Sequence, residues 1–145
     1  MVEIRRDKGL DRVGFLVKYP EFEELVEFNK KAVLLTEEYH LYEPDDEVKL
    51  RSLLIEAENK FNDLTEEEQI SWKASYLIYG ISAGQHFYEG NKRTALITGA
   101  AFLKINGYTI NIEDKRLLQV LDKCAILTAT LKELYIEIKR LIKND

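Results

Sequence analysis

The scarcity of helix-breaking residues is the feature that most restricts the fold of this chain. Its 145 residues include only seven glycines and two prolines, and neither kind is clustered. No stretch has the composition of a flexible linker or a low-complexity segment, and no internal repeat is visible. The length suits one ordinary domain. We therefore expect a single domain over residues 1–145 that is built mainly of helices.

Apolar side chains recur at intervals of three and four residues along most of the chain, as they do on the buried face of a helix. Together with capping and turn signals, this pattern predicts helices over residues 20–38, 44–61, 65–83 and 92–105, one that starts at a cap formed by Asn111 with Asp114 and runs to 127, and one from 130 onward. Residues 108–112 alternate between apolar and polar side chains, which predicts a short strand or an extended connector. We expect an all-α fold, a compact single-domain bundle of five to seven helices.

Several residues mark the expected helix ends. Pro20 can take the first helical position, where its missing amide hydrogen costs nothing. Thr65 and Thr130 each precede a glutamate by three residues, which is the spacing of a capping box. Gly107 follows the helix expected over 92–105 and suits the left-handed position beyond a helix end.

Composition and charge narrow the classes of function. The chain has 26 acidic and 21 basic residues and a net charge of −5, which argues against nucleic acid as a partner. Its longest apolar stretch, residues 95–103, is far shorter than the roughly 20 residues that span a bilayer, so we expect no membrane segment. One cysteine, Cys124, and two histidines cannot form a Cys/His zinc site. The charged N-terminal segment does not resemble a secretory signal and a lone cysteine suits a reducing compartment, so we expect a cytoplasmic protein.

The segment QHFYEGNKRT, which follows the third expected helix, breaks a rule of helix electrostatics. The start of a helix carries about half a positive charge and favours acidic side chains, yet Lys92 and Arg93 occupy the first turn. A turn at Gly90, a cap at Asn91, free amides and two cations together predict an anion site suited to phosphate. Glu89 can hold a Mg²⁺ ion that bridges phosphate oxygens. A solvated turn whose charges face water is the alternative.

The same segment resembles the signature of the Fic/Doc (Fido) family, which reads His-x-Phe-x-(Asp/Glu)-Gly-Asn-(Gly/Lys)-Arg. The similar residues here are 87–96, FYEGNKRTAL. Residues 102–108, FLKINGY, are similar to the Phe-Leu-x-x-Asn-Gly-Tyr that closes the following helix in Doc-like members. The resemblance covers about residues 40–130 and implies a compact helical fold of the Fido type.

The resemblance implies a transferase that moves a phosphate-containing group from a nucleotide to a hydroxyl of a target protein. Most members transfer AMP, whereas Doc-like toxins transfer a phosphoryl group. By position, Glu89 would bind Mg²⁺, and Gly90 with Asn91 would form the anion hole. Arg93 would contact the phosphates of ATP or a related nucleotide. Lys92 occupies a position that is often glycine in AMP-transferring members and lysine in Doc-like ones, which favours the Doc-like branch.

One departure from the signature concerns its histidine, which acts as the general base in the family and is replaced here by Gln85. An amide has no group that titrates near neutral pH, so it cannot take the proton of the attacking hydroxyl. General base catalysis contributes about 10²–10⁴ in rate. His86, one residue later, would replace the base only if the loop were shifted by one residue, and a loop position without a catalytic role is the simpler interpretation. His40 is interpreted as a surface residue.

Two functions follow from these residues. The first is a Doc-like Fido-domain protein that binds a magnesium-bound nucleotide and transfers a phosphoryl or AMP group to a target protein, with impaired or altered catalysis. The second is a catalytically degenerate Fido-fold protein that binds a nucleotide or a protein partner without transfer. The inhibitory family motif, Ser/Thr-x-x-x-Glu-(Gly/Asn), is only half matched at residues 54–59. Restraint would therefore come from a separate partner, such as the small antitoxins of Doc-like toxins.

Overall fold

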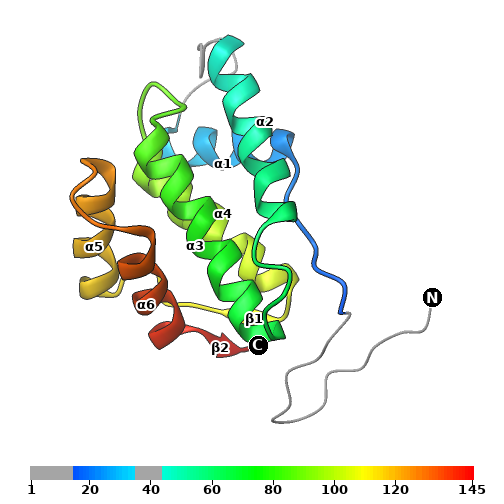
Figure 1. The fold of residues 1–145 in the computed structure, drawn as a ribbon. Coiled ribbons are helices and arrows are strands. Elements are labelled where there is room, and N and C mark those ends of the chain that lie inside the picture. The colour runs from blue at the N-terminus through cyan, green and yellow to red at the C-terminus, as the bar shows by residue number, and fades with distance from the viewer. Residues whose placement is uncertain (1–14, 35–43) are drawn as a thin grey trace.

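A computed structural model describes residues 15–34 and 44–145 of the chain, and within them it contains six helices and one small sheet (Figure 1). The helices are α1 (Phe22–Val33), α2 (Pro44–Asn59), α3 (Glu66–Gly84), α4 (Asn91–Ile105), α5 (Lys115–Ala125) and α6 (Leu131–Leu141). The sheet pairs β1 (Tyr108–Thr109) with β2 (Lys143–Asn144) in antiparallel fashion. The expected all-α class is confirmed.

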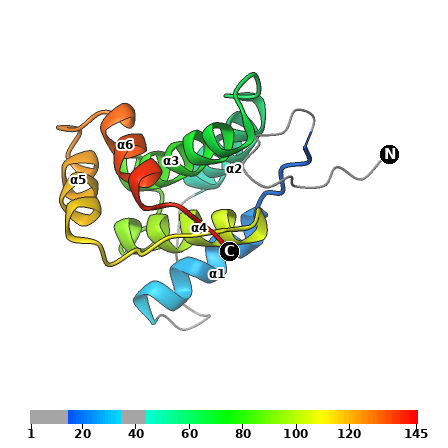
Figure 2. The same cartoon turned by 90° about the horizontal axis from the view of Figure 1, so that it is seen from below.

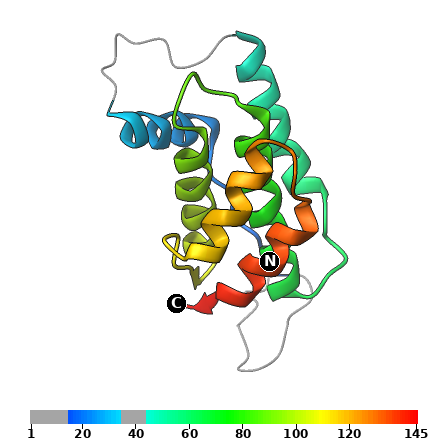
Figure 3. The ribbon, with the colours of Figure 1, turned by 90° about the vertical axis from the view of Figure 1, so that its left-hand side faces the viewer.

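Helices α3 and α4 run side by side through the middle of the molecule, and the other helices pack around this pair (Figures 1 and 2). Helix α1 lies against α4, α2 lies against α3, and α5 and α6 cover the side that Figure 3 turns toward the viewer. Buried apolar side chains from all six helices form one core. Five of them, each at most 1% exposed, come from different helices: Leu25, Leu77, Phe102, Leu121 and Ile138. No helix in the described ranges is long and apolar enough to cross a membrane.

One of the two expected capping boxes forms. At the start of α6, Thr130 Oγ1 accepts a hydrogen bond from the amide of Glu133 (3.2 Å), and the Glu133 carboxylate accepts one from the amide of Thr130 (3.0 Å). At the start of α3, the Thr65 hydroxyl instead donates to the Glu68 carboxylate (2.6 Å), and no side chain caps the helix there. A hydroxyl that donates to a charged carboxylate makes a strong hydrogen bond, which competes with the backbone amides.

The expectation for Pro20 is wrong, because α1 begins two residues later, at Phe22. Its cap residue is Glu21, whose amide donates to the Glu24 carboxylate at 3.0 Å. Acidic side chains in the first turn also match the positive end of the helix dipole. The remainder of the segment predicted to end at residue 38 lies outside the described residues.

Several helices are followed by residues with left-handed backbone that are not glycine. Leu34 (φ 57°) follows α1, Phe61 (φ 66°) lies just beyond α2, Gln85 (φ 51°) ends α3 and Leu127 (φ 60°) lies just beyond α5. The apolar pattern predicted that α2 and α5 end at residues 61 and 127, two residues later than they do. A left-handed residue at a helix end is usually glycine or asparagine, so Phe61 and Leu127 gave no sign that the helices stop there. Gly107 does adopt the expected left-handed conformation after α4 (φ 90°).

A buried lysine joins α2 to α3. Lys73 has no exposed surface, and its Nζ donates to the carbonyls of Ala57 (2.6 Å) and Glu58 (3.3 Å) at the end of α2. The ammonium also lies 5.3 Å from the ring centre of Tyr19. The carbonyl end of a helix is negative and favours a cation, but burial disfavours the charged form and lowers the pKa of Lys73 to about 8.

Candidate functional site

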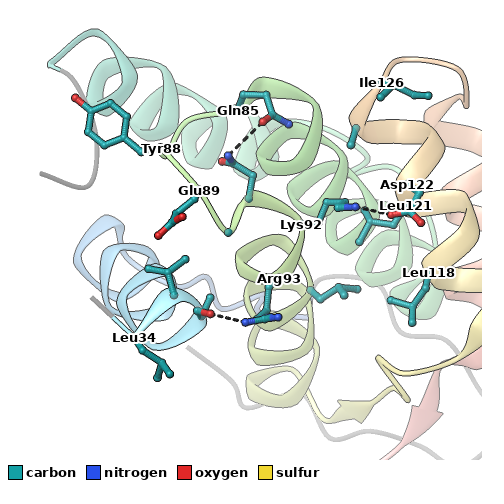
Figure 4. A pocket seen from close by; sticks show the side chains of 16 residues that line it. Leu34, Gln85, Tyr88, Glu89, Lys92, Arg93, Leu118, Leu121, Asp122 and Ile126 are labelled. Carbon is teal, nitrogen blue, oxygen red and sulfur yellow. Dashed lines mark hydrogen bonds and ion pairs between the residues drawn. The ribbon is translucent and has the colours of Figure 1, made fainter. Parts of the chain in front are cut away.

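A cavity of about 950 Å³ lies where the start of α4 meets the end of α1 and the side of α5 (Figure 4). The loop between α3 and α4 forms part of its rim. Its walls come from α1 and the residue after it (Ala32, Val33, Leu34), from the loop and α4 (Gln85, Tyr88, Glu89, Gly90, Asn91, Lys92, Arg93, Leu96), and from α5 and the residue after it (Leu118, Leu121, Asp122, Ala125, Ile126). The structure thus brings six of the seven predicted site residues to one cavity.

Gly90 shapes the start of α4. It is the cap residue, and its φ of 75° lies in the left-handed region that favours glycine. A Cβ atom at this position would collide with the side chain of Val33, so the glycine also lets the loop approach α1 closely. The first helical hydrogen bond runs from the Thr94 amide to the Gly90 carbonyl (2.8 Å). The amides of Lys92 and Arg93 precede that bond, so the helix itself provides no acceptor for them.

Asn91 does not cap α4 with its side chain, which corrects the sequence expectation. It is the first residue of the helix and is buried. Its Oδ1 accepts from the amide of Phe87 (3.0 Å), and its Nδ2 donates to the Phe87 carbonyl (2.9 Å) and to Gln85 Oε1 (3.3 Å). The side chain of Asn91 therefore joins the start of α4 to Gln85 and Phe87 of the loop. Its backbone amide is the group that Asn91 can offer to a ligand.

Gln85 lies at the cavity and is held by protein hydrogen bonds. Its Nε2 donates to the carbonyl of Ser82, and its Oε1 accepts from Asn91. Both ends of the amide are thus engaged, the nitrogen by the last turn of α3 and the oxygen by the first residue of α4, the second of these bonds being drawn in Figure 4.

His86 lies away from the cavity. Its side chain is buried, its ring packs closely on Gly84, and it is not among the cavity residues. Its Nδ1 is buried without a hydrogen-bond partner among the described residues. Burial lowers the pKa of His86, because the charged ring loses its hydration. The structure therefore places Gln85, and not His86, beside the predicted phosphate site. His40 lies outside the described residues.

The two cations at the start of α4 both have partners within the protein. Lys92 Nζ lies 2.6 Å from a carboxylate oxygen of Asp122 on α5. Arg93 Nη1 donates to the carbonyl of Ala32 (2.6 Å), near the negative end of α1. The cost of placing cations at a helix start is therefore offset partly by these contacts, which the sequence alone could not reveal. Both side chains remain exposed and line the cavity.

The sequence reasoning missed Asp122, which lines the cavity, and Asn29, which lies behind it and positions the loop. Asn29 is 1% exposed, and its Nδ2 donates to the Glu89 carbonyl (3.0 Å) and to the Thr94 hydroxyl (3.0 Å). The available signal was a polar residue within the apolar stripe of α1, between Leu25 and Ala32. Glu89 itself is exposed and lines the cavity.

The interpretation of this site depends on the residues of the chain itself. No model of a known protein family matches the sequence, and no curated protein matches it. Membership of the Fic/Doc family therefore stays a hypothesis, which rests on residues 87–96 and 102–108.

The residues present fit a magnesium ion that arrives with a nucleotide. In the described part of the chain, no group of three or more histidine, cysteine, aspartate and glutamate side chains could hold a metal by itself. A Mg²⁺ bound to phosphates keeps several waters and needs only one or two protein carboxylates. Glu89 can provide one such carboxylate at the edge of the cavity.

The wall along α5 is largely apolar, with Asp122 as its charged residue. The apolar surface is formed mainly by Leu96 of α4 and by Leu118, Leu121 and Ala125 of α5, with Ile126 at the exposed edge. The cavity thus combines charged groups at the start of α4 with a largely apolar wall, an arrangement typical of sites for ligands that carry both a charged and an apolar part.

Proposed function

We propose that this cavity binds a magnesium-bound nucleotide such as ATP, with the phosphates at the start of α4. The observation that carries the proposal is that the start of α4 and the side chains of Lys92 and Arg93 line the same cavity, with Lys92 directed toward α5 and Arg93 toward α1. Amides at a helix start and the helix dipole favour bound anions, and cationic side chains strengthen them. The resemblance of residues 87–96 to the Fic/Doc signature supports the same ligand.

Each site residue has a distinct part in the proposed complex. Gly90 allows the turn, and the amides after it donate to phosphate oxygens. Arg93 and Lys92 add charge-assisted hydrogen bonds. Glu89 would hold the magnesium ion, which when bound neutralises phosphate charge and orients the phosphates. The apolar wall of α5 would contact the less polar part of the nucleotide.

Binding without efficient transfer is the activity that the geometry favours. Transfer to a hydroxyl needs a base near the phosphates, and Gln85 cannot act as one because an amide does not titrate near neutral pH. His86 does not line the cavity. The proposed protein is thus a Fic/Doc-type nucleotide-binding protein with impaired catalysis.

The second candidate function is transfer of a phosphoryl or AMP group to a target protein, with altered catalysis. The position of Gln85 favours a transferase origin, because it lines the cavity beside the proposed phosphate site. A base at this position would face the ligand. This function implies two partners: a target protein that carries the modified hydroxyl, and a small antitoxin that inhibits the transferase.

Calorimetric titration with ATP and MgCl₂ tests the binding proposal. We expect measurable binding by the unaltered chain and by Lys104→Ala, a control at the exposed far end of α4. Arg93→Ala should bind about tenfold or more weakly, since a hydrogen bond to a charged group contributes about 1.5–3 kcal/mol. Melting curves of all variants check that the loss is not unfolding, because Arg93 also contacts Ala32. No binding of any common nucleotide would contradict the proposal.

Labelled ATP distinguishes the two candidates. The chain and Gln85→His are incubated with host lysate and with ATP labelled at the α- or γ-phosphate. Weak or no transfer by the original chain and a gain by Gln85→His would support the degenerate form. Equal transfer by both would favour the transferase and a base elsewhere. Loss of that transfer in His86→Ala would identify a shifted base.

A further inference from the structure

The ion pair between Lys92 and Asp122 lies within the proposed binding site. It joins the first turn of α4 to α5, with 2.6 Å between Nζ and the carboxylate oxygen, and both residues line the cavity (Figure 4). The two side chains are 52% and 64% exposed. Water and ions therefore reach the pair, and a ligand can compete for either partner.

Asp122 is the only charged residue that α5 contributes to the described cavity wall. The other wall residues of that helix, Leu118, Leu121 and Ala125, are apolar. A phosphate group at the start of α4 would approach Lys92 from the same cavity and would meet the carboxylate of Asp122 there. Two anions cannot share one lysine without repulsion, which water and salt weaken at this exposed position but do not remove.

We propose that Asp122 is an internal competitor of the ligand, which occupies Lys92 when the site is empty and must be displaced when phosphate binds. This inference rests on the proposed function. It assigns to Asp122 a role in setting the affinity of the site, although the residue lies 30 positions after Lys92 in the sequence. Ligands with several negative charges displace the carboxylate more effectively than a monoanion does.

Displacement requires no large rearrangement of the fold. Helix α5 packs mainly against α3 and α6, and its buried side chains Leu117, Leu121 and Cys124 hold it in the core. The Lys92–Asp122 pair is a contact at its exposed side. The lysine can therefore exchange its partner while α5 keeps its place.

The test compares pyrophosphate and Mg-ATP binding by calorimetry, at low ionic strength, for the original chain and for Asp122→Asn. This change removes the charge and preserves the shape. We expect about two- to fivefold tighter binding by Asp122→Asn, the range that corresponds to the loss of one competing exposed ion pair. Glu113→Gln, an exposed acid just before α5, changes the net charge equally and should leave the affinity unchanged. In the Lys92→Ala background the competition for the lysine is gone, so Asp122→Asn should change the affinity less than it does in the original chain.

Each outcome has a definite meaning. Equal or weaker binding by Asp122→Asn, with binding by the original chain intact, would overturn the competitor role and leave the proposed function standing. Equal gains in Asp122→Asn and Glu113→Gln would assign the effect to net charge and would also overturn it. Binding by Asp122→Asn alone would support strong competition. Absence of binding in every variant would overturn the proposed function and this inference with it.

Discussion

Asn29 of α1 donates a hydrogen bond from its side chain to the backbone carbonyl of Glu89, 60 residues later in the sequence and 3.0 Å away. The same nitrogen donates to the hydroxyl of Thr94 in the first turn of α4. One buried amide therefore fixes both the loop and the helix start against α1. The position of the proposed phosphate site depends on a helix that lies outside the signature segment.

Removal of this amide should destabilise the protein. Asn29→Ala leaves a buried hydroxyl and a carbonyl without their donor, and each unsatisfied buried group costs about 1–3 kcal/mol. We expect a loss in unfolding free energy of that order, measured by urea denaturation. Asn59→Ala is the matched control, because Asn59 is exposed and its side chain bonds, within the described ranges, to the Ile55 carbonyl of its own helix. It should change stability by less than about 0.5 kcal/mol. Equal effects of the two changes would show that the Asn29 bonds are dispensable.

Gly90→Ala should cost more than a change at the other left-handed glycine near α4. The left-handed backbone alone costs about 1–2 kcal/mol for alanine, and at Gly90 the new Cβ would also collide with Val33. Gly107→Ala is the control: Gly107 has a φ of 90° at the other end of α4, so this variant measures the cost of the left-handed backbone for alanine. Val33→Ala should recover part of the loss in Gly90→Ala. If the two glycine variants unfold at the same urea concentration, α1 moves to accommodate the added methyl group without loss of stability, and the prediction is wrong.

The stability of the protein should fall at mildly acidic pH because of His86. Burial lowers the pKa of this histidine from its ordinary value of 6.5. Below about pH 6.5 the unfolded chain therefore binds a proton that the folded chain resists, so stability declines as the pH falls toward the folded-state value. Above about pH 7 both states are neutral at this residue and the effect disappears.

The contribution of His86 can be isolated by difference. Urea unfolding of the original chain and of His86→Asn is measured between about pH 5 and pH 8, since carboxylates also titrate at the lower end. The difference in unfolding free energy between the two proteins should shift in favour of the variant as the pH falls. A pH-independent difference would show that His86 takes up its proton equally in the folded and unfolded states.

Tyr135 should control the fluorescence of the protein. Trp72 is the single tryptophan, and its ring stacks on Tyr135 with 3.9 Å between centroids and 8° between planes. Tyr135→Ala should expose the indole and shift its emission to longer wavelengths. The loss of the aromatic pair should also lower stability by about 0.5–1.5 kcal/mol beyond the buried area. Tyr88→Ala, at the rim of the cavity, should leave the emission maximum in place; a shift of similar size there would contradict the assignment.

The helices could be predicted from the sequence because their signals are local. Apolar periodicity located the helices, and the Thr130 capping box placed the start of α6 correctly. The ends were less predictable, because Leu34 and Leu127 adopt a left-handed backbone without glycine. The pairing of β1 with β2 joins segments about 35 residues apart, and alternation within residues 108–112 says nothing about such a partner.

The candidate site could be predicted only as far as the segment that carries it. Gly90 and the two cations lie at the start of α4, where the local pattern placed them. The partners of the two cations come from other helices, namely Asp122 of α5 for Lys92 and the Ala32 carbonyl of α1 for Arg93. Such contacts depend on how the helices pack, so they cannot be predicted from the spacing of residues along the chain. The packing also decided that Gln85 faces the cavity while His86 is buried.

The burial of Lys73 gives the chain a chemical reporter of its own unfolding. The Lys73 side chain is closed to any reagent while α2 and α3 stay together. Hydration after opening returns the pKa of this amine from about 8 to its ordinary value of 10.5, so exposed Lys73 reacts with acylating reagents as any other lysine does. The exposed lysines react first. The rate at which Lys73 is acylated afterwards would therefore report how often these two helices separate.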